Sequence, residues 1–249
     1  MINFLVPSPY KALLLGLLAA WIVLLLAGLL FGKPGPDRRN RLPLPLRMTL
    51  SMLLLLAAGL WQRGGTAGTP LATMGVWLTL GMACGLLGDL FMAGLLVPKP
   101  RNVIFGILAF GAGHIAYILA FRQIAQVIGL GSGPVWLWSL LLCLLLGLVL
   151  WLTLVRTPAR GAVLNIGTLL YSLLLALMAG NAFALAFQTT GFGPLAAGAA
   201  LFMLSDLILG NELMRRTYFP SIGDVIWTSY TVAQMLIIYG AAANALRLL

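Results

Sequence analysis

Two aspartates lie within long apolar runs of this sequence and are its clearest candidates for chemistry. Asp89 falls in GLLGDLFMAGLL (residues 85–96), and Asp206 falls in LFMLSDLILGNE (residues 201–212). The chain has only five acidic residues among 249. Burial disfavours the charged form of a carboxyl group, so a carboxyl in such surroundings can stay protonated near neutral pH. A protonated and an ionised carboxyl could act together as acid and base if the fold brings them close.

The composition places both aspartates in a membrane protein. Apolar residues make up 61% of the chain and charged residues 8%, and the mean hydropathy is +1.05. A soluble domain is nearer half apolar and a quarter charged. The net charge of +10 does not indicate a nucleic-acid partner, because the basic residues lie in short loops between apolar runs. Cys84 and Cys143 both fall inside apolar runs, and we expect free thiols rather than a disulfide framework.

Eight apolar runs are long enough to cross a bilayer, which takes about 20 mostly apolar residues. The sequence therefore predicts an all-α bundle of eight transmembrane helices, forming a single domain over residues 1–249. The predicted spans cover roughly residues 10–31, 43–61, 70–97, 103–121, 134–155, 162–187, 192–213 and 222–246. The second span is the weakest, since its strongly apolar part is short.

The basic residues predict the orientation. Eight spans put both termini on one side of the membrane, and most Lys and Arg residues fall in the loops on the other side. These residues are Lys33, Arg38, Arg39, Arg41, Arg47, Lys99, Arg101, Arg156, Arg160, Arg215 and Arg216. The positive-inside rule makes their side cytoplasmic and leaves both termini non-cytoplasmic. We expect a multi-pass protein of a bacterial plasma membrane, surrounded by membrane lipids.

Polar residues on other spans could surround the two carboxyls. Counting back from the predicted span ends, Asp89 and Asp206 lie at a matched depth, about 10–12 Å from the cytoplasmic boundary. Glycines such as Gly81, Gly85 and Gly198 on the same helix faces would allow close helix approach. The further candidates are His114 and Tyr117 on span 4, Asn165 on span 6, and Tyr230 and Gln234 on span 8. Spans 1 and 5 are almost wholly apolar and are expected to face lipid.

A purely structural interpretation of these residues remains open. Each Asp could be neutral, cap a helix or pair with an Arg, and His114 could be a hydrogen-bonded core residue. Tyr230 and Gln234 could join helices to one another. Asp224 is expected to cap span 8, because an acid at a helix N-terminus interacts favourably with the helix dipole.

A weak internal similarity relates the two halves of the chain. Spans 3–4 align with spans 7–8 so that Asp89 matches Asp206 and Tyr117 matches Gln234. A duplicated four-span unit, with halves at 1–121 and 134–249, is therefore a hypothesis.

Four stretches, in order, resemble the YhhN-like lysoplasmalogenases. They are GLLGDLFM (85–92), FGILAFGAGHIAYILAF (105–121), GAALFMLSDLIL (198–209) and YTVAQMLIIYG (230–240), which cover under half the chain. The residues that carry the resemblance are Asp89; Phe105, Gly106, Phe110, His114 and Tyr117; Gly198, Phe202, Ser205 and Asp206; and Tyr230 and Gln234. Gly106 directly follows Phe105, which departs from the family spacing.

The resemblance implies a hydrolase that cleaves the vinyl ether bond of lysoplasmalogens, with Asp89 and Asp206 essential. The products would be a fatty aldehyde and a glycerophosphoethanolamine or glycerophosphocholine. Vinyl ethers are acid-labile: a proton added at the β-carbon gives an oxocarbenium ion, which water then attacks. Two carboxyl groups serve a comparable transition state in glycosidases. We expect no cofactor and no metal, since the chain has one His and no Cys/His cluster.

The residues suggest a division of roles. Asp206 is expected to be the acid, because Phe202 and Met203 give it apolar neighbours, and Asp89, beside glycines, the ionised partner. The predicted supporting residues are His114, Tyr117, Ser205, Tyr230, Gln234 and Asn165. The predicted phosphate or head-group ligands are Lys99, Arg101, Arg215 and Arg216, although membrane topology alone also explains these charges.

Two other functions would also use a pair of membrane carboxyls. One is a proton-coupled carrier, in which Asp89 and Asp206 shuttle protons without covalent chemistry. The other is an intramembrane aspartyl protease. The stretch GLLGD is similar to the glycine-rich signature of that class. Against the protease, Ser205 stands where a Tyr is expected before the second Asp, and no Pro-Ala-Leu follows.

Overall fold

The computed structural model describes residues 6–35, 37–131 and 133–249. Residues 1–5, 36 and 132 belong to the predicted single domain but lie outside the described part. The described residues form eight long helices and no strand, each long and apolar enough to cross a membrane. The long helices are α1 (Ser8–Phe31), α2 (Leu44–Leu60), α3 (Ala72–Met92), α4 (Asn102–Val127), α5 (Pro134–Leu150), α6 (Ala162–Gln188), α7 (Gly193–Arg215) and α8 (Ile222–Arg247). The predicted all-α, eight-span membrane protein is confirmed.

Two helix ends differ from the prediction. Helix α3 ends at Met92 rather than near residue 97, because Gly94 adopts a φ of +73° that only glycine takes easily. Asp89 therefore lies three residues before the end of its helix, whereas Asp206 lies nine before the end of α7. The matched depth was counted from predicted span ends, and α3 ends earlier than that count assumed, so the two aspartates are not equally far from their helix ends. Helix α4 runs on to Val127, beyond the predicted end at residue 121.

Short irregular turns extend three of the spans. A π-helical turn, Trp61–Thr66 (η1), continues α2, and a second, Trp151–Val155 (η2), continues α5. A 3₁₀ turn, Thr190–Phe192 (η3), leads into α7. The weak second span is thereby lengthened to Leu44–Thr66.

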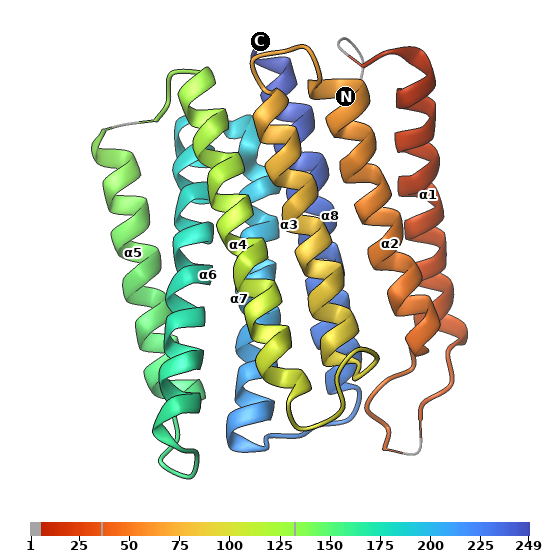
Figure 1. Ribbon diagram of the computed structural model, residues 1–249, viewed down its shortest axis with the longest axis vertical. Helices are drawn as coiled ribbons and strands as arrows, with labels where there is room; N and C mark the ends of the chain where they lie inside the picture. Colours follow the sequence, from red (N-terminus) through yellow and green to blue (C-terminus); the bar gives the residue numbers. More distant parts are fainter. Residues whose placement is uncertain (1–5, 36, 132) are drawn as a thin grey trace.

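The helices run up and down along one axis, with α3, α4, α7 and α8 in the middle of the bundle (Figure 1). The α1–α2 pair lies on one side of these four helices, and the α5–α6 pair lies on the other. The start of α1 and the end of α8 lie at one end of the molecule, whereas the α1–α2, α3–α4, α5–α6 and α7–α8 loops all lie at the other end.

The outer helices expose leucine-rich faces. Leu30 on α1 and Leu142 on α5 are more than half exposed, as expected for side chains that face lipid.

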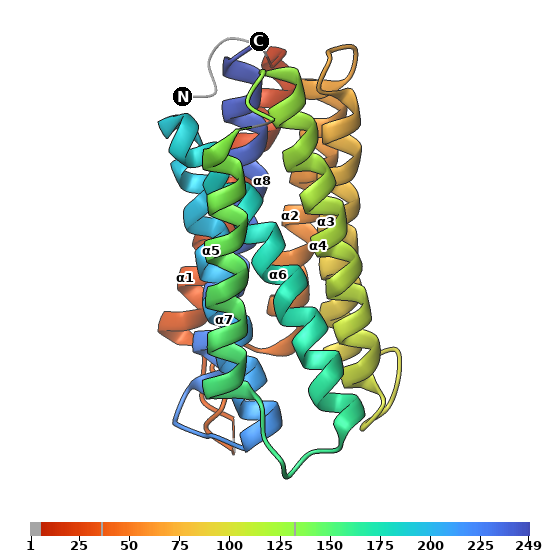
Figure 2. The same cartoon turned by 90° about the vertical axis from the view of Figure 1, so that its left-hand side faces the viewer.

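Helix α6 packs unevenly along its length: none of its residues before Leu175 is buried. Helix α7 likewise has no buried residue between Ser205 and Met214. Figure 2 shows α6 crossing the bundle obliquely. Its first half lies at the end that carries the α1–α2, α3–α4, α5–α6 and α7–α8 loops, which we call the loop-rich end.

Glycines let the central helices approach closely. A Cβ added at Gly81 would lie 2.4 Å from the ring of Tyr117 on α4, and one at Gly198 would lie 2.9 Å from the carbonyl oxygen of Ala233 on α8. These positions hold α3 against α4 and α7 against α8 at distances that a side chain would prevent.

Candidate functional site

Asp89 lies at the centre of a polar cluster inside the bundle. Its side chain is buried, and its Oδ2 accepts a hydrogen bond of 2.6 Å from Ser51 Oγ on α2 and one of 3.2 Å from the Tyr230 hydroxyl on α8. Arg47, one helical turn before Ser51, is close enough to Asp89 to interact with it electrostatically but does not form an ion pair with it. Asp89 is therefore held by hydroxyl groups of two neighbouring helices.

Asp206 is half-buried and belongs to a second chain of hydrogen bonds. The Tyr171 hydroxyl on α6 donates a hydrogen bond to Asp206 Oδ2. The Nε2 atom of His114 on α4 lies 3.1 Å from the same hydroxyl. His114 is buried, and its Nδ1 has no hydrogen-bond partner among the described residues.

Aromatic rings connect the two carboxyl groups. The Phe202 ring packs edge-on against His114, with centroids 4.8 Å apart, and against Tyr230, with centroids 5.3 Å apart. Tyr230 donates a hydrogen bond to Asp89, and His114 contacts the Tyr171 hydroxyl that donates to Asp206. The fold thus gathers side chains of α2, α3, α4, α6, α7 and α8 in one region, which we call the carboxyl cluster.

A third set of hydrogen bonds supports Tyr230. Gln234 Nε2 lies 3.2 Å from the Tyr230 hydroxyl, and the Tyr117 hydroxyl donates to Gln234 Oε1 at 2.5 Å. A Cβ at Gly85 would lie 2.7 Å from Gln234 Nε2. The glycine at 85 therefore makes room for the amide that orients Tyr230 beside Asp89.

The structure brings together most of the predicted site residues. Asp89, Asp206, His114, Tyr117, Tyr230 and Gln234 all belong to the carboxyl cluster or to the hydrogen bonds that support it. Ser205 is buried next to Asp206, but its hydroxyl donates to the carbonyl oxygen of Ile226 at 3.2 Å. Ser205 therefore helps to fix α7 against α8.

Asn165 lies elsewhere, contrary to the prediction. Its side chain accepts a hydrogen bond from the backbone of Thr157 and donates to the carbonyl oxygens of Thr157 and Arg160. These bonds hold the α5–α6 loop against the first turn of α6. The hydroxyl of Thr168, on the same helix, accepts a hydrogen bond of 3.1 Å from Trp151 Nε1.

Asp224 lies in the first turn of α8, as predicted, but forms no cap hydrogen bond with that helix. Its carboxylate accepts hydrogen bonds from the backbone N–H groups of Arg41 and Leu42, which lie just before α2. Arg39 pairs with Glu212 of α7 in the same region, with a second contact of 2.8 Å from Nη2 to Oε2. The α1–α2 loop is thus tied to the α7–α8 end.

The predicted head-group ligands do not form one group. Arg215 and Arg216 line a pocket together with Arg156 and Arg160 of the α5–α6 loop. Lys99 and Arg101 are exposed in the α3–α4 loop and do not line that pocket. The two arginines missed by the prediction come from a loop that the linear sequence places far from α7.

Ser51 and Tyr171 are the cluster residues that sequence reasoning missed. Ser51 lies in the weak second span, and nothing in its surroundings marks it as polar-facing. Tyr171 lies on α6, where the sequence analysis named Asn165 instead. In the described ranges, no three His, Cys, Asp or Glu side chains lie close enough together to hold a metal ion.

The fold and the cluster define a multi-pass α-helical membrane protein with two carboxyl groups joined to buried hydroxyl and imidazole groups. The model of the YhhN family matches residues 46–241, which is most of the chain, and the protein belongs to that family. Comparison with curated proteins gave no match, and comparison with solved structures gave none.

Proposed function

We propose that this protein is a hydrolase of a bacterial plasma membrane that cleaves the vinyl ether bond of lysoplasmalogens by carboxyl acid/base catalysis. The observation that carries the proposal is the carboxyl cluster, in which the buried Asp89 and the half-buried Asp206 are connected through hydrogen-bonded and packed aromatic side chains. Family membership and the resemblance of the sequence motifs to lysoplasmalogenases support the choice of bond.

In the proposed reaction Asp206 is the acid. Its proton is transferred to the β-carbon of the vinyl ether, which leaves an oxocarbenium ion at the carbon bonded to the ether oxygen. Asp89 in its ionised form stabilises this cation and takes a proton from the attacking water. When the hemiacetal collapses, Asp89 returns a proton to the glycerol oxygen and the hemiacetal hydroxyl returns one to Asp206. The products are a fatty aldehyde and a glycerophospho-base.

Tyr171 and His114 suit the proton cycle of Asp206. With Asp206 ionised, the Tyr171 hydroxyl donates to it, and His114 Nε2–H donates to the Tyr171 oxygen. With Asp206 protonated, both hydrogen bonds can reverse, since a hydroxyl donates or accepts and a neutral imidazole can exchange tautomers. The same three atoms, Asp206 Oδ2, Tyr171 Oη and His114 Nε2, therefore accommodate both protonation states of Asp206 without moving.

The loosely packed end of α6 and α7 supports access to Asp206. Asp206 lies where the buried part of α7 ends, and the facing half of α6 has no buried residue. An alkenyl chain could reach the carboxyl from the lipid between these helices, with its apolar part among leucines of α6.

The test is aldehyde release from a lysoplasmalogen by the purified protein. Asp89→Asn and Asp206→Asn should each lower the rate at least about a hundredfold, the lower end of what acid–base groups contribute. Asp37→Asn is the matched control, because it makes the same change in an exposed loop and should keep the rate. Unchanged cleavage in both cluster variants would refute the proposal, and gradient-driven uptake without aldehyde release would favour the proton-coupled carrier instead.

A further inference from the structure

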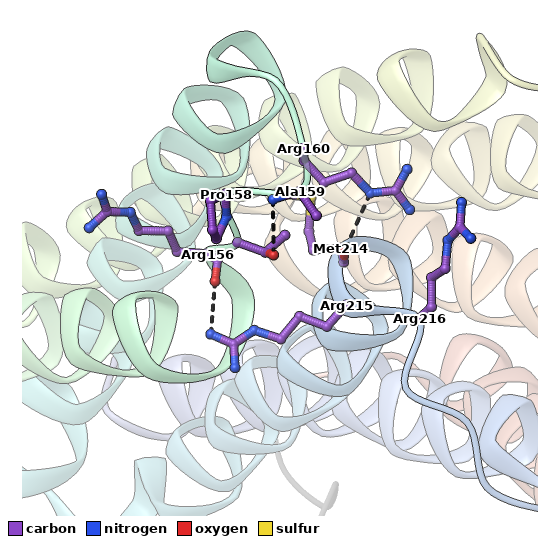
Figure 3. A pocket seen from close by; sticks show the side chains of 8 residues that line it. Arg156, Pro158, Ala159, Arg160, Met214, Arg215 and Arg216 are labelled. Carbon is purple, nitrogen blue, oxygen red and sulfur yellow. Dashed lines mark hydrogen bonds between the residues drawn. The ribbon is translucent and has the colours of Figure 1, made fainter.

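Four arginines surround one hollow at the loop-rich end of the molecule. The hollow has a volume of about 640 Å³ and lies between the α5–α6 loop and the end of α7 (Figure 3). We call it the arginine pocket, and its lining residues are Arg156, Thr157, Pro158, Ala159, Arg160, Met214, Arg215 and Arg216.

No acidic residue belongs to this lining. Glu212, which precedes Arg215 by one helical turn, is paired with Arg39 of the α1–α2 loop. Four guanidinium groups that line one hollow repel one another, and an anion between them would remove that repulsion. A lining with four arginines and no acidic residue favours an anionic ligand over a cationic one.

The four arginines fall into two pairs by their contacts. Arg160 donates to the carbonyl oxygens of Leu213 (2.7 Å) and Met214 (3.2 Å), and Arg215 donates to that of Arg156 (2.8 Å). These bonds join the α5–α6 loop to the end of α7, as Figure 3 shows. Arg160 and Arg215 thus form the fixed frame of the pocket.

Arg156 and Arg216 have more freedom. Figure 3 shows the Arg156 side chain extending away from Arg160 and Arg215. The Arg156 guanidinium lies only loosely over the Trp151 ring, 5.9 Å from its centroid, and the Arg216 side chain makes no hydrogen bond or ion pair with the described residues. Both side chains retain their N–H donors for a ligand and can close over it.

We propose that the arginine pocket binds a phosphoryl group, carried by a lipid head group or by free phosphate. Guanidinium groups bind phosphate oxygens through two parallel hydrogen bonds. A phosphate group has tetrahedral oxygens that several arginines can bind at once, whereas a single carboxylate offers only two oxygens in one plane. The pocket also lies at the end of the membrane-spanning helices, where phospholipid head groups are found.

The position of the pocket suits the lipid source if the proposed function holds. Arg215 follows Asp206 by nine residues of α7, or about 14 Å along the helix axis. Seven bonds separate the vinyl ether β-carbon from the phosphorus of a lysoplasmalogen, which spans about 8 Å when extended. The side chains of Asp206 and of the pocket arginines can reach across the rest of the distance between Asp206 and the pocket.

The test measures binding rather than turnover, so its result does not depend on the proposed reaction. The probes are an ester-linked lysophosphatidylethanolamine, the monoacylglycerol with the same acyl chain, and inorganic phosphate, each titrated onto the purified protein in neutral detergent. Arg216→Gln and Arg156→Gln should each weaken binding of a phosphoryl probe about tenfold, which corresponds to one charge-assisted hydrogen bond. Both variants leave the frame of the pocket intact.

Lys33→Gln is the control for overall charge, because Lys33 is exposed at the same end of the molecule but outside the pocket. It should bind like the unmodified protein, and Arg216→Lys should bind with intermediate affinity. Arginine-dependent binding of the lysophospholipid but not of the monoacylglycerol supports a lipid source, and arginine-dependent binding of phosphate alone supports a free anion. Binding of both phosphoryl probes that is unchanged in Arg216→Gln and Arg156→Gln, or no binding of either probe, overturns the proposal.

Discussion

At the scale of single residues, hydroxyl groups rather than cations hold the two central carboxyls. Asp89 is bound by Ser51 and Tyr230, and Asp206 by Tyr171. In the described part of the chain, the ion pair formed is Arg39–Glu212, and it lies outside the cluster. An ion pair with Arg would fix a carboxyl in its charged form, whereas a hydroxyl can bond to either form. The cluster therefore leaves both carboxyls free to exchange a proton.

Tyr171→Phe tests this property at Asp206. The substitution removes the hydroxyl that joins Asp206 to His114 and keeps the ring. We expect kcat for aldehyde release to fall about tenfold to a hundredfold, because an oriented donor to the acid is lost. KM should change little, and the pH profile of kcat should shift, which a merely structural role would not cause.

The matched control for that variant is Tyr239→Phe. Tyr239 is also buried, and its hydroxyl donates at 2.8 Å to the carbonyl oxygen of Leu14, far along α8 from the cluster. It should lose about 1 kcal/mol of stability, as for one hydrogen bond, but keep kcat and its pH profile. Equal pH profiles for Tyr171→Phe and the unmodified protein would contradict a role in proton transfer.

At the scale of the helices, the sequence predicts more about membrane spans than about what each face contacts. Apolar runs gave all eight spans, and glycine-rich faces correctly marked α3 and α7 as central. The end of α3 was missed because it depends on one glycine with positive φ. Ser51, Tyr171 and the contacts of Asp224 were missed because they join elements far apart in the chain. The contacts of Asn165 are local, but they depend on how the α5–α6 loop folds back on α6. Such contacts depend on how the helices are rotated, which periodicity in a uniformly apolar span does not reveal.

Gly81→Ala tests whether close approach of α3 and α4 stabilises the central bundle. The new Cβ would lie 2.4 Å from the Tyr117 ring, which is fully buried, so the ring or the helices must shift. Overpacking of this kind typically costs 1–3 kcal/mol, and we expect a lower midpoint of thermal unfolding in detergent. Gly16→Ala on α1 is the control, since its Cβ would meet nothing within 4 Å. A melting midpoint unchanged in Gly81→Ala would show that the contact is not tight.

At the scale of the whole molecule, charge is separated along the bundle axis. The loops opposite the termini carry most of the basic residues, and they also hold the arginine pocket and the Arg39–Glu212 contact (Figure 1). Asp206 and the loosely packed half of α6 lie toward the same end. The carboxyl cluster is therefore nearer to the basic end, so membrane orientation determines which leaflet would supply the substrate of the proposed reaction.

The orientation predicted by the positive-inside rule can be tested with single cysteines. In a background lacking Cys84 and Cys143, Lys33→Cys reports on the basic end, and Ala67→Cys reports on the end that carries the termini; both positions are exposed. In intact cells a membrane-impermeant maleimide should label Ala67→Cys and should label Lys33→Cys only after the membrane is permeabilised. The opposite pattern would place the arginine pocket and the approach to Asp206 outside the cytoplasm. The substrate would then have to come from the outer leaflet, because a head group bound by those arginines cannot also lie on the far side of the bilayer.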